Sequence, residues 1–270
     1  MKKNDEITRI NKRHWEKMVN EGCDFTIPWL ELDVDIIKKF VKGQLDPVPE
    51  PLLSIYPANI LVDLEDKDVL CLAAGGGQQS AVFSLLGAHV TVLDLAEGQL
   101  KGDQKAANHY GYEINTIQGD MRDLSCVEDM SFDLVYGTGM SYIPEVKQVY
   151  SEVARVLRPG GKYRVDYANP ATEFVDAHDW DGMGYRITRP YTERVRRRKD
   201  GAIEFRHTMS SIFNGLLTVG LSIEHVQEAP YYQQYVQAKP GSWEHWLTYV
   251  TGFAIVARRV PKGIATLEAR

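Results

Sequence analysis

Three consecutive glycines, Gly75, Gly76 and Gly77, directly follow a short apolar run, and this pair of features constrains the fold most. The run at residues 69–72 is continuous rather than alternating, which is typical of a strand covered on both faces in a parallel sheet. Residues 80–86 then read as a helix. Glycines let a backbone approach a ligand closely, and the free amides at a helix start favour negatively charged groups. The sequence therefore predicts a strand, a glycine turn and a helix, with a ligand at the turn.

Further apolar runs alternate with helical segments along the middle of the chain. Helices of this length between strands give right-handed crossovers and a parallel sheet with helices on both faces. The expected fold is therefore α/β, a doubly wound, mostly parallel, Rossmann-like seven-stranded sheet with an antiparallel C-terminal pair at one edge. Besides 69–72, the expected strands are 90–93, 112–117, 132–136, 162–167, 222–227 and 249–258, and the expected helices after 80–86 are 97–110, 146–157 and 209–219.

Three segments fall outside this alternating core. Residues 1–56 are expected to form an N-terminal helical cap with a helix at 6–20, and residues 57–270 form the main domain. The second segment is a lid-like insertion. The third, residues 229–248, is rich in tyrosine and tryptophan and is predicted to be a loop.

The insertion at about residues 168–207 is expected to hold a β-hairpin. Extended runs at 192–198 and 202–207 flank Lys199-Asp200-Gly201, a turn signal of the Asp-Gly type. Positive charge gathers on one face of this hairpin. A solvated face is the favoured interpretation, with contact to an anionic acceptor or nucleic acid as the alternative. The cluster consists of Arg194, Arg196 and Arg198.

The overall charge gives no basic field for an extended nucleic-acid surface, so a nucleic-acid partner is not expected. The formal net charge is −6, with 44% hydrophobic and 25% charged residues, which is ordinary globular usage. No window reaches the roughly 18 apolar residues of a membrane helix, and a signal peptide is not recognisable, so we expect a cytoplasmic protein. The cysteines are odd in number and form no CxxC pair, which predicts reduced thiols at Cys23, Cys71 and Cys126.

Asp94 ends the second predicted strand, 17 residues after Gly77, where a carboxylate can accept hydrogen bonds from both ribose hydroxyls. The glycine turn and this carboxylate predict a nucleoside cofactor but do not choose between nicotinamide and S-adenosylmethionine. Gly119-Asp120-Met121 follows the third strand, and residues 132–135 and 157–161 mark the fourth strand and the approach to the fifth. In this order and spacing the segments resemble the class I S-adenosylmethionine-dependent methyltransferases.

The resemblance covers residues 66–168 and implies a role for each residue around the turn. One part of the site wraps the methionine moiety, another holds the ribose and adenine, and a third lies on the sulfonium side. The implied residues are Ala73, Gly75, Gly76 and Gly77 at the methionine part, Asp94 at the ribose, Leu95 and Met121 beside the adenine, Asp120 at its exocyclic amine, and Tyr136 and Gly137 near the sulfonium.

The chain departs from the family pattern at two positions. Cys71 stands where the family usually has an acidic residue, and Ala73 stands where it usually has glycine. The flexible glycines that follow should still form the turn. Gln78 or Gln79 is a candidate to hold the amino group of the methionine part instead.

The motifs around strands four and five limit the classes of methyl acceptor that fit this chain. Neither the Asn-Pro-Pro-Tyr of adenine-amino enzymes nor the Pro-Cys of cytosine enzymes is present. Asp166 and Asn169 could supply two metal ligands, but Gly137 offers none, so no metal is expected. The remaining group resembles the small-molecule methyltransferases of quinone biosynthesis. The alternatives are a nicotinamide-dependent oxidoreductase and a cofactor-binding module without turnover.

A small-molecule acceptor is expected over the ends of strands four and five, under a lid made of residues 10–30 and 170–207, because open α/β sheets bind ligands there. Direct in-line methyl transfer needs alignment and exclusion of water rather than a covalent intermediate. Tyr142 is the candidate catalytic residue, since its hydroxyl could orient or deprotonate the acceptor. The predicted acceptor contacts are His14, Trp15, Trp29, Tyr142, Tyr167 and Tyr185.

Overall fold

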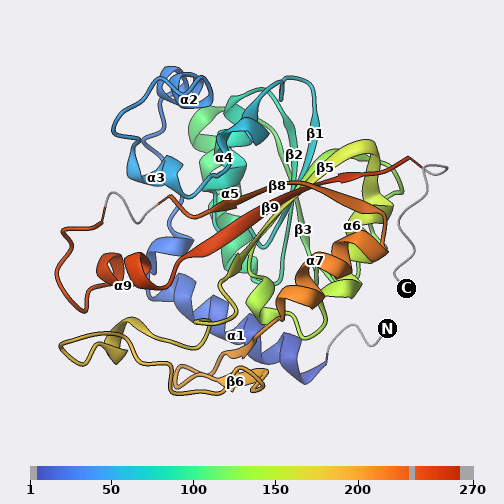
Figure 1. The fold of residues 1–270 in the computed structure, drawn as a ribbon. Coiled ribbons are helices and arrows are strands. Elements are labelled where there is room, and N and C mark those ends of the chain that lie inside the picture. The colour runs from blue at the N-terminus through green and yellow to red at the C-terminus, as the bar shows by residue number, and fades with distance from the viewer. Residues whose placement is uncertain (1–4, 231–234, 262–270) are drawn as a thin grey trace.

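The computed structural model describes residues 5–230 and 235–261, which fold around one seven-stranded sheet (Figure 1). The strand order is β3-β2-β1-β4-β5-β9-β8, in which β1 to β5 pair in parallel and β9 pairs antiparallel with both β5 and β8. The predicted doubly wound sheet with an antiparallel edge is therefore confirmed. Its strands are β1 (Asp68–Leu72), β2 (His89–Asp94), β3 (Ile114–Gln118), β4 (Phe132–Gly137), β5 (Leu157–Ala168), β8 (Leu221–Glu228) and β9 (Gly252–Arg259).

Helices cover both faces of the sheet, as right-handed crossovers require. α4 and α5 pack together on one face, and α6 and α7 pack together on the other (Figure 1). Within residues 5–230 and 235–261, none of the helices has the length and apolar character needed to cross a bilayer. The four helices are α4 (Gln79–Leu85), α5 (Glu97–Tyr110), α6 (Val146–Val156) and α7 (Met209–Thr218).

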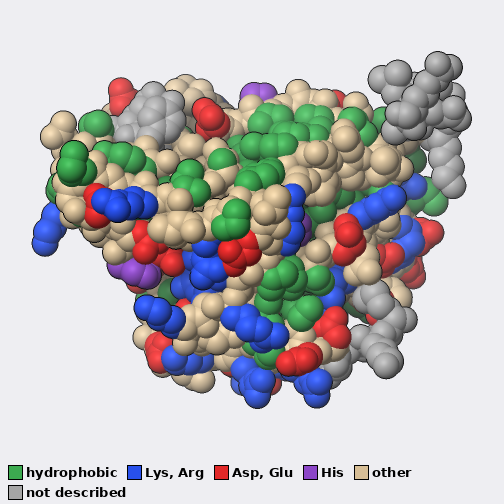
Figure 2. Space-filling model, turned by 60° about the horizontal axis from the view of Figure 1, so that its bottom comes forward, with side chains coloured by type: hydrophobic (Ala, Val, Ile, Leu, Met, Phe, Trp, Pro, Cys, Tyr) green, Lys and Arg blue, Asp and Glu red, His purple; other side chains and the backbone are tan. Residues whose placement is uncertain are grey.

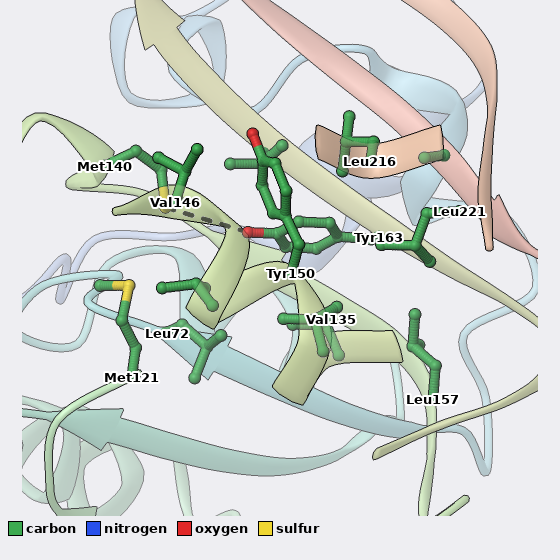
Figure 3. Close-up of a cluster of buried hydrophobic side chains, with 14 of the residues drawn as sticks. Leu72, Met121, Val135, Met140, Val146, Tyr150, Leu157, Tyr163, Leu216 and Leu221 are labelled. Carbon is green, nitrogen blue, oxygen red and sulfur yellow. Dashed lines mark hydrogen bonds between the residues drawn. The ribbon is translucent and has the colours of Figure 1, made fainter. Parts of the chain in front are cut away.

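Two apolar layers hold these helices against the sheet. Under α6 and α7, Tyr150 and Tyr163 are fully buried, and the Tyr163 hydroxyl points to the Met140 sulfur (Figure 3). On the other face, the fully buried Cys71 and Phe83 share a cluster with residues that precede the sheet. Burial of each large side chain contributes about 1.5–3 kcal/mol, so both layers stabilise the fold strongly. Cys71 serves as a small hydrophobic side chain in this layer.

The N-terminal segment contains α1 (Glu6–Asn20), α2 (Val34–Val41) and α3 (Glu50–Leu53). The Asp5 side chain caps α1 by accepting a hydrogen bond from the Thr8 amide at 2.9 Å. α1 then runs below the sheet and contacts α5 and the hairpin strand β7 (Ile203–Phe205) (Figure 1). Segments far apart in the sequence therefore meet along α1.

The predicted hairpin is present as β6 (Val195–Arg197) and β7 (Ile203–Phe205), and Arg198 is exposed on it as expected, but Arg196 corrects the prediction of a solvated face. Arg196 is 7% exposed and donates to Glu204 and Asp176, each at 2.8 Å. Burial demands such partners, because an unpaired guanidinium in the interior is very unfavourable. On the face that carries α1 and the hairpin, basic and acidic side chains are mixed (Figure 2).

Three element boundaries also differ from the prediction. Residues 243–249, expected in a loop, form α9 (Trp243–Tyr249), because the Ser242 hydroxyl caps the helix by accepting from the His245 amide at 3.2 Å. β9 consequently begins at Gly252 rather than at Tyr249. β5 begins five residues earlier than expected, since Leu157 already pairs with Phe132 and a register shift absorbs the extra residues.

Candidate functional site

A cavity of about 760 Å³ lies beyond the carboxyl ends of the parallel strands. The loops after β1, β2, β3 and β4 form one wall, and α1, α3, α9 and the short helix η1 (Asp24–Thr26) form the other. Open α/β sheets bind ligands at this edge, and the volume falls within the range of small-molecule sites. The cavity is therefore the candidate active site.

The glycine turn after β1 follows an unusual backbone path. Ala73, Gly75, Gly76 and Gly77 have φ values of +50°, +67°, +53° and +80°, a left-handed run that favours glycine. A Cβ on Gly77 would lie 2.5 Å from the carbonyl oxygen of Gly102 in α5. Ala73 and Gly75 line the cavity, whereas Gly76 and Gly77 are absent from its described lining and let the turn touch α5.

Asp103 of α5 holds this turn, and sequence reasoning missed it. Its Oδ1 accepts hydrogen bonds from the Gly77 amide at 2.8 Å and the Ser80 hydroxyl at 2.5 Å. The carboxyl group is 1% exposed, and burial raises its pKa to about 6. Asp103 thus supplies a carboxylate behind the turn. In the family pattern an acidic residue at the position of Cys71 is usual, and this chain lacks it. No spacing rule indicates that an α5 side chain reaches Gly77.

Asp94, the last residue of β2, lines the cavity and is 7% exposed. Its Oδ1 accepts a hydrogen bond from the Ala96 amide at 2.8 Å, which fixes the orientation of the carboxyl group. Burial raises the pKa of Asp94 to about 7. Leu95 and Met121 line the same end of the cavity, so a carboxyl group and two apolar side chains are brought together as predicted.

Comparison with known proteins assigns this geometry to a family. Residues 69–161 match the family described as a methyltransferase domain. The uncharacterized methyltransferase YbaJ of Bacillus subtilis is 30% identical over 225 residues, which cover 79% of this chain and 87% of the relative. The chain belongs to the S-adenosylmethionine-dependent methyltransferases. S-adenosylmethionine is therefore its cofactor, and the nicotinamide alternative is not favoured.

Solved structures show the same fold as this methyltransferase. An S-adenosylmethionine-dependent methyltransferase from Mesorhizobium loti superposes with a TM-score of 0.63 at 22% identity, covering 86% of this chain and all of that one. Geranyl diphosphate C-methyltransferase from Streptomyces coelicolor gives a TM-score of 0.63 at 13% identity, with 96% of this chain and 100% of that chain covered. A demethylmenaquinone methyltransferase of Clavibacter sepedonicus is 34% identical over 129 residues, 47% of this chain and 51% of the relative. This last relative is matched over only about half of its length.

The glutamines at the turn of the methyltransferase fit a polar ligand. Gln79 and Gln99 line the cavity, and the buried Oε1 atom of each has no hydrogen-bond partner among the described residues. Buried polar atoms are normally satisfied, so these two suit the amino-acid part of the cofactor. Gln78 also lines the cavity, but its side-chain amide donates to the carbonyl oxygens of Asp24 at 2.7 Å and Ile27 at 2.9 Å, and thereby holds the N-terminal segment against the turn.

Asp120 lines the cavity, but its carboxylate is already engaged. Arg122 donates to Asp120 at 2.6 Å and to Asp5 at 2.9 Å, and the Thr8 hydroxyl donates to Asp120 at 2.9 Å. The hydrogen bond from Arg122 lowers the pKa of Asp5 to about 2. The loop after β3 is therefore bound to the start of α1, and a role of Asp120 at the adenine amine stays a prediction.

The end of β4 places Tyr136 and Tyr142 in the cavity wall, but not Gly137. A Cβ on Gly137 would lie 3.0 Å from the Tyr163 hydroxyl, so this glycine accommodates a core ring. The Tyr142 ring meets Trp15 edge to face, with centroids 5.6 Å apart. Burial raises the pKa of the Tyr142 hydroxyl, which therefore stays protonated at neutral pH.

The predicted acceptor contacts separate into two groups. Trp15, Trp29 and Tyr142 line the cavity, whereas His14, Tyr167 and Tyr185 are absent from its described lining. His14 packs behind Trp15 and Tyr142. Tyr167 forms a hydrogen bond with Tyr150 in the core, and Tyr185 forms one with His245 at 2.9 Å.

Several lining residues were not among the predicted site residues. They lie on η1, in and directly after α3, in the loop after β3, in the loop before α9 and on α9 itself. Among the described residues, no group of His, Cys, Asp or Glu is arranged to hold a metal ion. The lining residues that sequence reasoning did not place in the site include Phe25, Glu50, Ser54, Tyr56, Arg122, Tyr235, Trp243 and Leu247.

Proposed function

We propose that this methyltransferase binds S-adenosylmethionine at the turn end of its cavity and methylates a small molecule held at the other end, beneath α1. The observation that carries the proposal is that one cavity is lined both by Gly75 and Asp94 and by the aromatic side chains of Trp15, Tyr56 and Trp243. A buried carboxyl group beside a glycine turn suits a nucleoside, and an aromatic enclosure suits an organic acceptor.

Different residues at the turn end would contact different parts of the cofactor. The backbone at Ala73 and Gly75 would hold the methionine part, with Gln79 and Gln99 offering their unpaired Oε1 atoms to its amino group. Asp94 would accept from the ribose hydroxyls. The remaining contacts are Leu95 and Met121 beside the adenine, Asp120 at its amine, and Tyr136 near the sulfonium.

Bound S-adenosylmethionine supplies a methyl group activated on a sulfonium. The chain's own residues align the acceptor and exclude water, which together account for most of what such a transfer needs. Tyr142 stays protonated, so its hydroxyl would donate a hydrogen bond to the acceptor and orient it rather than remove a proton. The Tyr142 loop is held by the amide of Tyr142, which donates to the Gly139 carbonyl at 3.0 Å.

The relatives guide the class of acceptor. They include proteins named as demethylmenaquinone, ubiquinone and sterol methyltransferases, whose names describe acceptors with apolar bodies. By this likeness, and by the apolar rings in the cavity, we propose a small acceptor with an apolar body. We also propose a cytoplasmic location, which agrees with three unpaired cysteines.

The segments outside the core would act as a cap and a lid. Residues 1–56 would form the cap, residues 57–270 the catalytic domain, and the insertion at 168–207 the lid. Asn11 of α1 supports this arrangement, because its side chain bonds the Ile203 amide at 2.9 Å and the Ile203 carbonyl at 3.1 Å. α1 and the hairpin would therefore close over the acceptor together.

Calorimetry with S-adenosylhomocysteine tests the proposed cofactor site. Asp94→Ala should weaken binding by about 1.5–3 kcal/mol, the value of hydrogen bonds to a charged group. Asp35→Ala is the control, because Asp35 is an exposed carboxylate on α2 outside the cavity lining. Equal affinity in both variants would show that the ribose is held elsewhere.

A further inference from the structure

We infer that the acceptor of this methyltransferase carries a positively charged nitrogen, bound at the end of the cavity where Asp166 and Glu50 lie. The inference rests on the proposed function, since it names the acceptor class of the same cavity. Five features carry it: the place of Asp166, its support by Arg164, the second carboxylate of Glu50, the charge balance of the lining and its aromatic walls.

Asp166 lies too far across the sheet to belong to the nucleoside end. It stands on β5, and the strands β1 and β4 separate β5 from β2, which carries Asp94. At about 4.8 Å per strand, the two carboxyl-bearing positions are roughly 14 Å apart. The last pair between β4 and β5 is Gly137 with Val165, so Asp166 stands one position further, beside Thr138. Asp166 therefore lies at the end of the cavity where the acceptor is proposed to bind.

A buried arginine fixes the Asp166 carboxylate. Arg164 is 1% exposed and donates from Nη1 to Asp166 Oδ1 at 2.9 Å. Its guanidinium lies over the rings of Tyr56 and Tyr136, at 4.9 and 4.5 Å from their centroids. The Asp166 side chain is 34% exposed and lines the cavity. Arg164 therefore orients a carboxylate that remains accessible to a ligand.

Glu50 brings a second carboxylate to the same end. The segment after α3 is tied to β4 and β5, because the Tyr136 hydroxyl donates to the Ser54 carbonyl at 3.4 Å and Arg164 Nε donates to the Tyr56 carbonyl at 2.9 Å. Glu50, the first residue of α3, accepts from the Tyr235 hydroxyl at 2.8 Å. Glu50 and Tyr235 both line the cavity.

The charged residues of the lining are predominantly acidic. Within the described part of the chain, Arg122 is the one basic side chain that lines the cavity, and Asp5 and Asp120 already engage it. The hairpin arginines do not line it. A surface of this sign attracts cations and repels anions. The acidic lining residues are Asp24, Glu50, Asp94, Asp120 and Asp166.

Aromatic rings in the same cavity add a second attraction for a cation. Tyr56, Trp29, Trp243 and Trp15 line the cavity, and Tyr56 lies beside Arg164, the partner of Asp166. A ring face attracts an ammonium group, tryptophan most strongly, and the attraction grows when water is excluded. The same rings accommodate an apolar body. An amine on an apolar scaffold therefore fits this end better than a carboxylate or a phosphate.

The test compares probes that share an apolar scaffold and carry a cationic, a neutral or an anionic end group. Tryptamine, tryptophol and indole-3-acetate share one ring and carry an amine, an alcohol and a carboxylate, and phenethyl and decyl series provide two further scaffolds. Their affinities are measured by calorimetry on the full chain saturated with S-adenosylhomocysteine. In at least one scaffold the amine should bind at least tenfold more tightly than the alcohol, with no binding of the carboxylate. Raising the salt concentration should reduce this preference, because partly exposed charges are screened.

Two variants link the preference to the named carboxylates. Asp166→Asn should weaken amine binding about tenfold, equal to about 1.4 kcal/mol, and leave alcohol binding unchanged. Because this change also removes a charged partner of Arg164, Glu50→Lys serves as a second variant that leaves the buried pair intact. It should weaken the amine about tenfold and improve the carboxylate. Asp35→Asn is the matched control and should change neither.

The outcomes separate this inference from the proposed function. Failure of S-adenosylhomocysteine to bind overturns the proposed function and this inference with it. If S-adenosylhomocysteine binds but no scaffold shows a preference for the amine, the inference alone is overturned. The inference is also overturned if the amine is preferred but neither Glu50→Lys nor Asp166→Asn changes that preference. An amine preference that Glu50→Lys abolishes supports it.

Discussion

The two ends of the cavity are built in different ways. The turn end is built around backbone, a left-handed path through Gly75 to Gly77 that contacts Gly102 of α5, with a few side chains beside it. The acceptor end consists of side chains from α1, α3, β5 and α9, which lie far apart in the sequence. A backbone site tolerates almost no added atom, whereas a side-chain site can change its chemistry without changing the fold.

The largest expected effect falls on the backbone end. Gly77→Ala places a Cβ 2.5 Å from the Gly102 oxygen at a φ of +80°, and should destabilise the protein by about 3 kcal/mol or more. Gly111→Ala is the matched control, because its φ is +78° and a Cβ there meets nothing within 4 Å. It should lose about 1–2 kcal/mol from strain alone. Equal losses in urea unfolding would contradict the claimed contact between the turn and α5.

The buried carboxyl group of Asp94 should make stability depend on pH. Its folded pKa, about 7, exceeds the ordinary value of 3.8, so the folded protein holds a proton that the unfolded chain has lost between these values. Stability should therefore fall as pH rises from 4 to 7. Asp94→Asn removes the contribution of Asp94 and keeps that of Asp103, so its stability relative to wild type should increase by about 3–4 kcal/mol over the window. A constant difference between the two proteins in urea titrations would refute this account.

At the acceptor end, Asn11→Leu should loosen the hairpin from α1. The change leaves the buried Ile203 amide and carbonyl without their partner, at a cost of about 1–3 kcal/mol. Trypsin cleavage near Lys199 should become about tenfold faster, while affinity for S-adenosylhomocysteine changes less than twofold. Asn20→Leu, at the exposed end of the same helix, should leave the cleavage rate unchanged. Unaltered cleavage in Asn11→Leu would mean that other contacts hold the hairpin.

Tyr142→Phe should have the smallest effect. The hydroxyl stays protonated and would contribute one neutral hydrogen bond, about 1 kcal/mol or roughly fivefold in turnover. The turnover of the best amine from the probe panel measures this, with the melting temperature as a check on folding. A loss of a hundredfold would instead assign proton transfer to Tyr142, and full activity would leave it as a wall of the cavity.

The same difference explains what could be predicted from the sequence. The strand, turn and helix around Gly75, and the carboxylate of Asp94, follow local patterns of apolar runs and glycines, so their positions could be read along the chain. Asp103 could not, because its bond to Gly77 depends on how α5 packs.

The acceptor end was harder to predict for the same reason. Tyr167 and Tyr185 have the aromatic character expected of acceptor contacts, but hydrogen bonds to Tyr150 and His245 hold them elsewhere. Trp243 lines the cavity from α9, a helix that Ser242 caps. The aromatic composition of residues 229–248 had instead suggested a loop. Side-chain type alone does not determine which residues tertiary packing brings into a cavity.

α1 contributes to both ends of the cavity, and this has a kinetic consequence. Thr8 bonds Asp120 at the cofactor end, Asn11 bonds the hairpin, and Trp15 covers the acceptor end. On the proposed assignment of the two ends, one helix would therefore control the exit of both products. When its detachment is slower than methyl transfer, the first turnover will be faster than the following ones, and mutations that weaken the attachment of α1 will raise the steady-state rate.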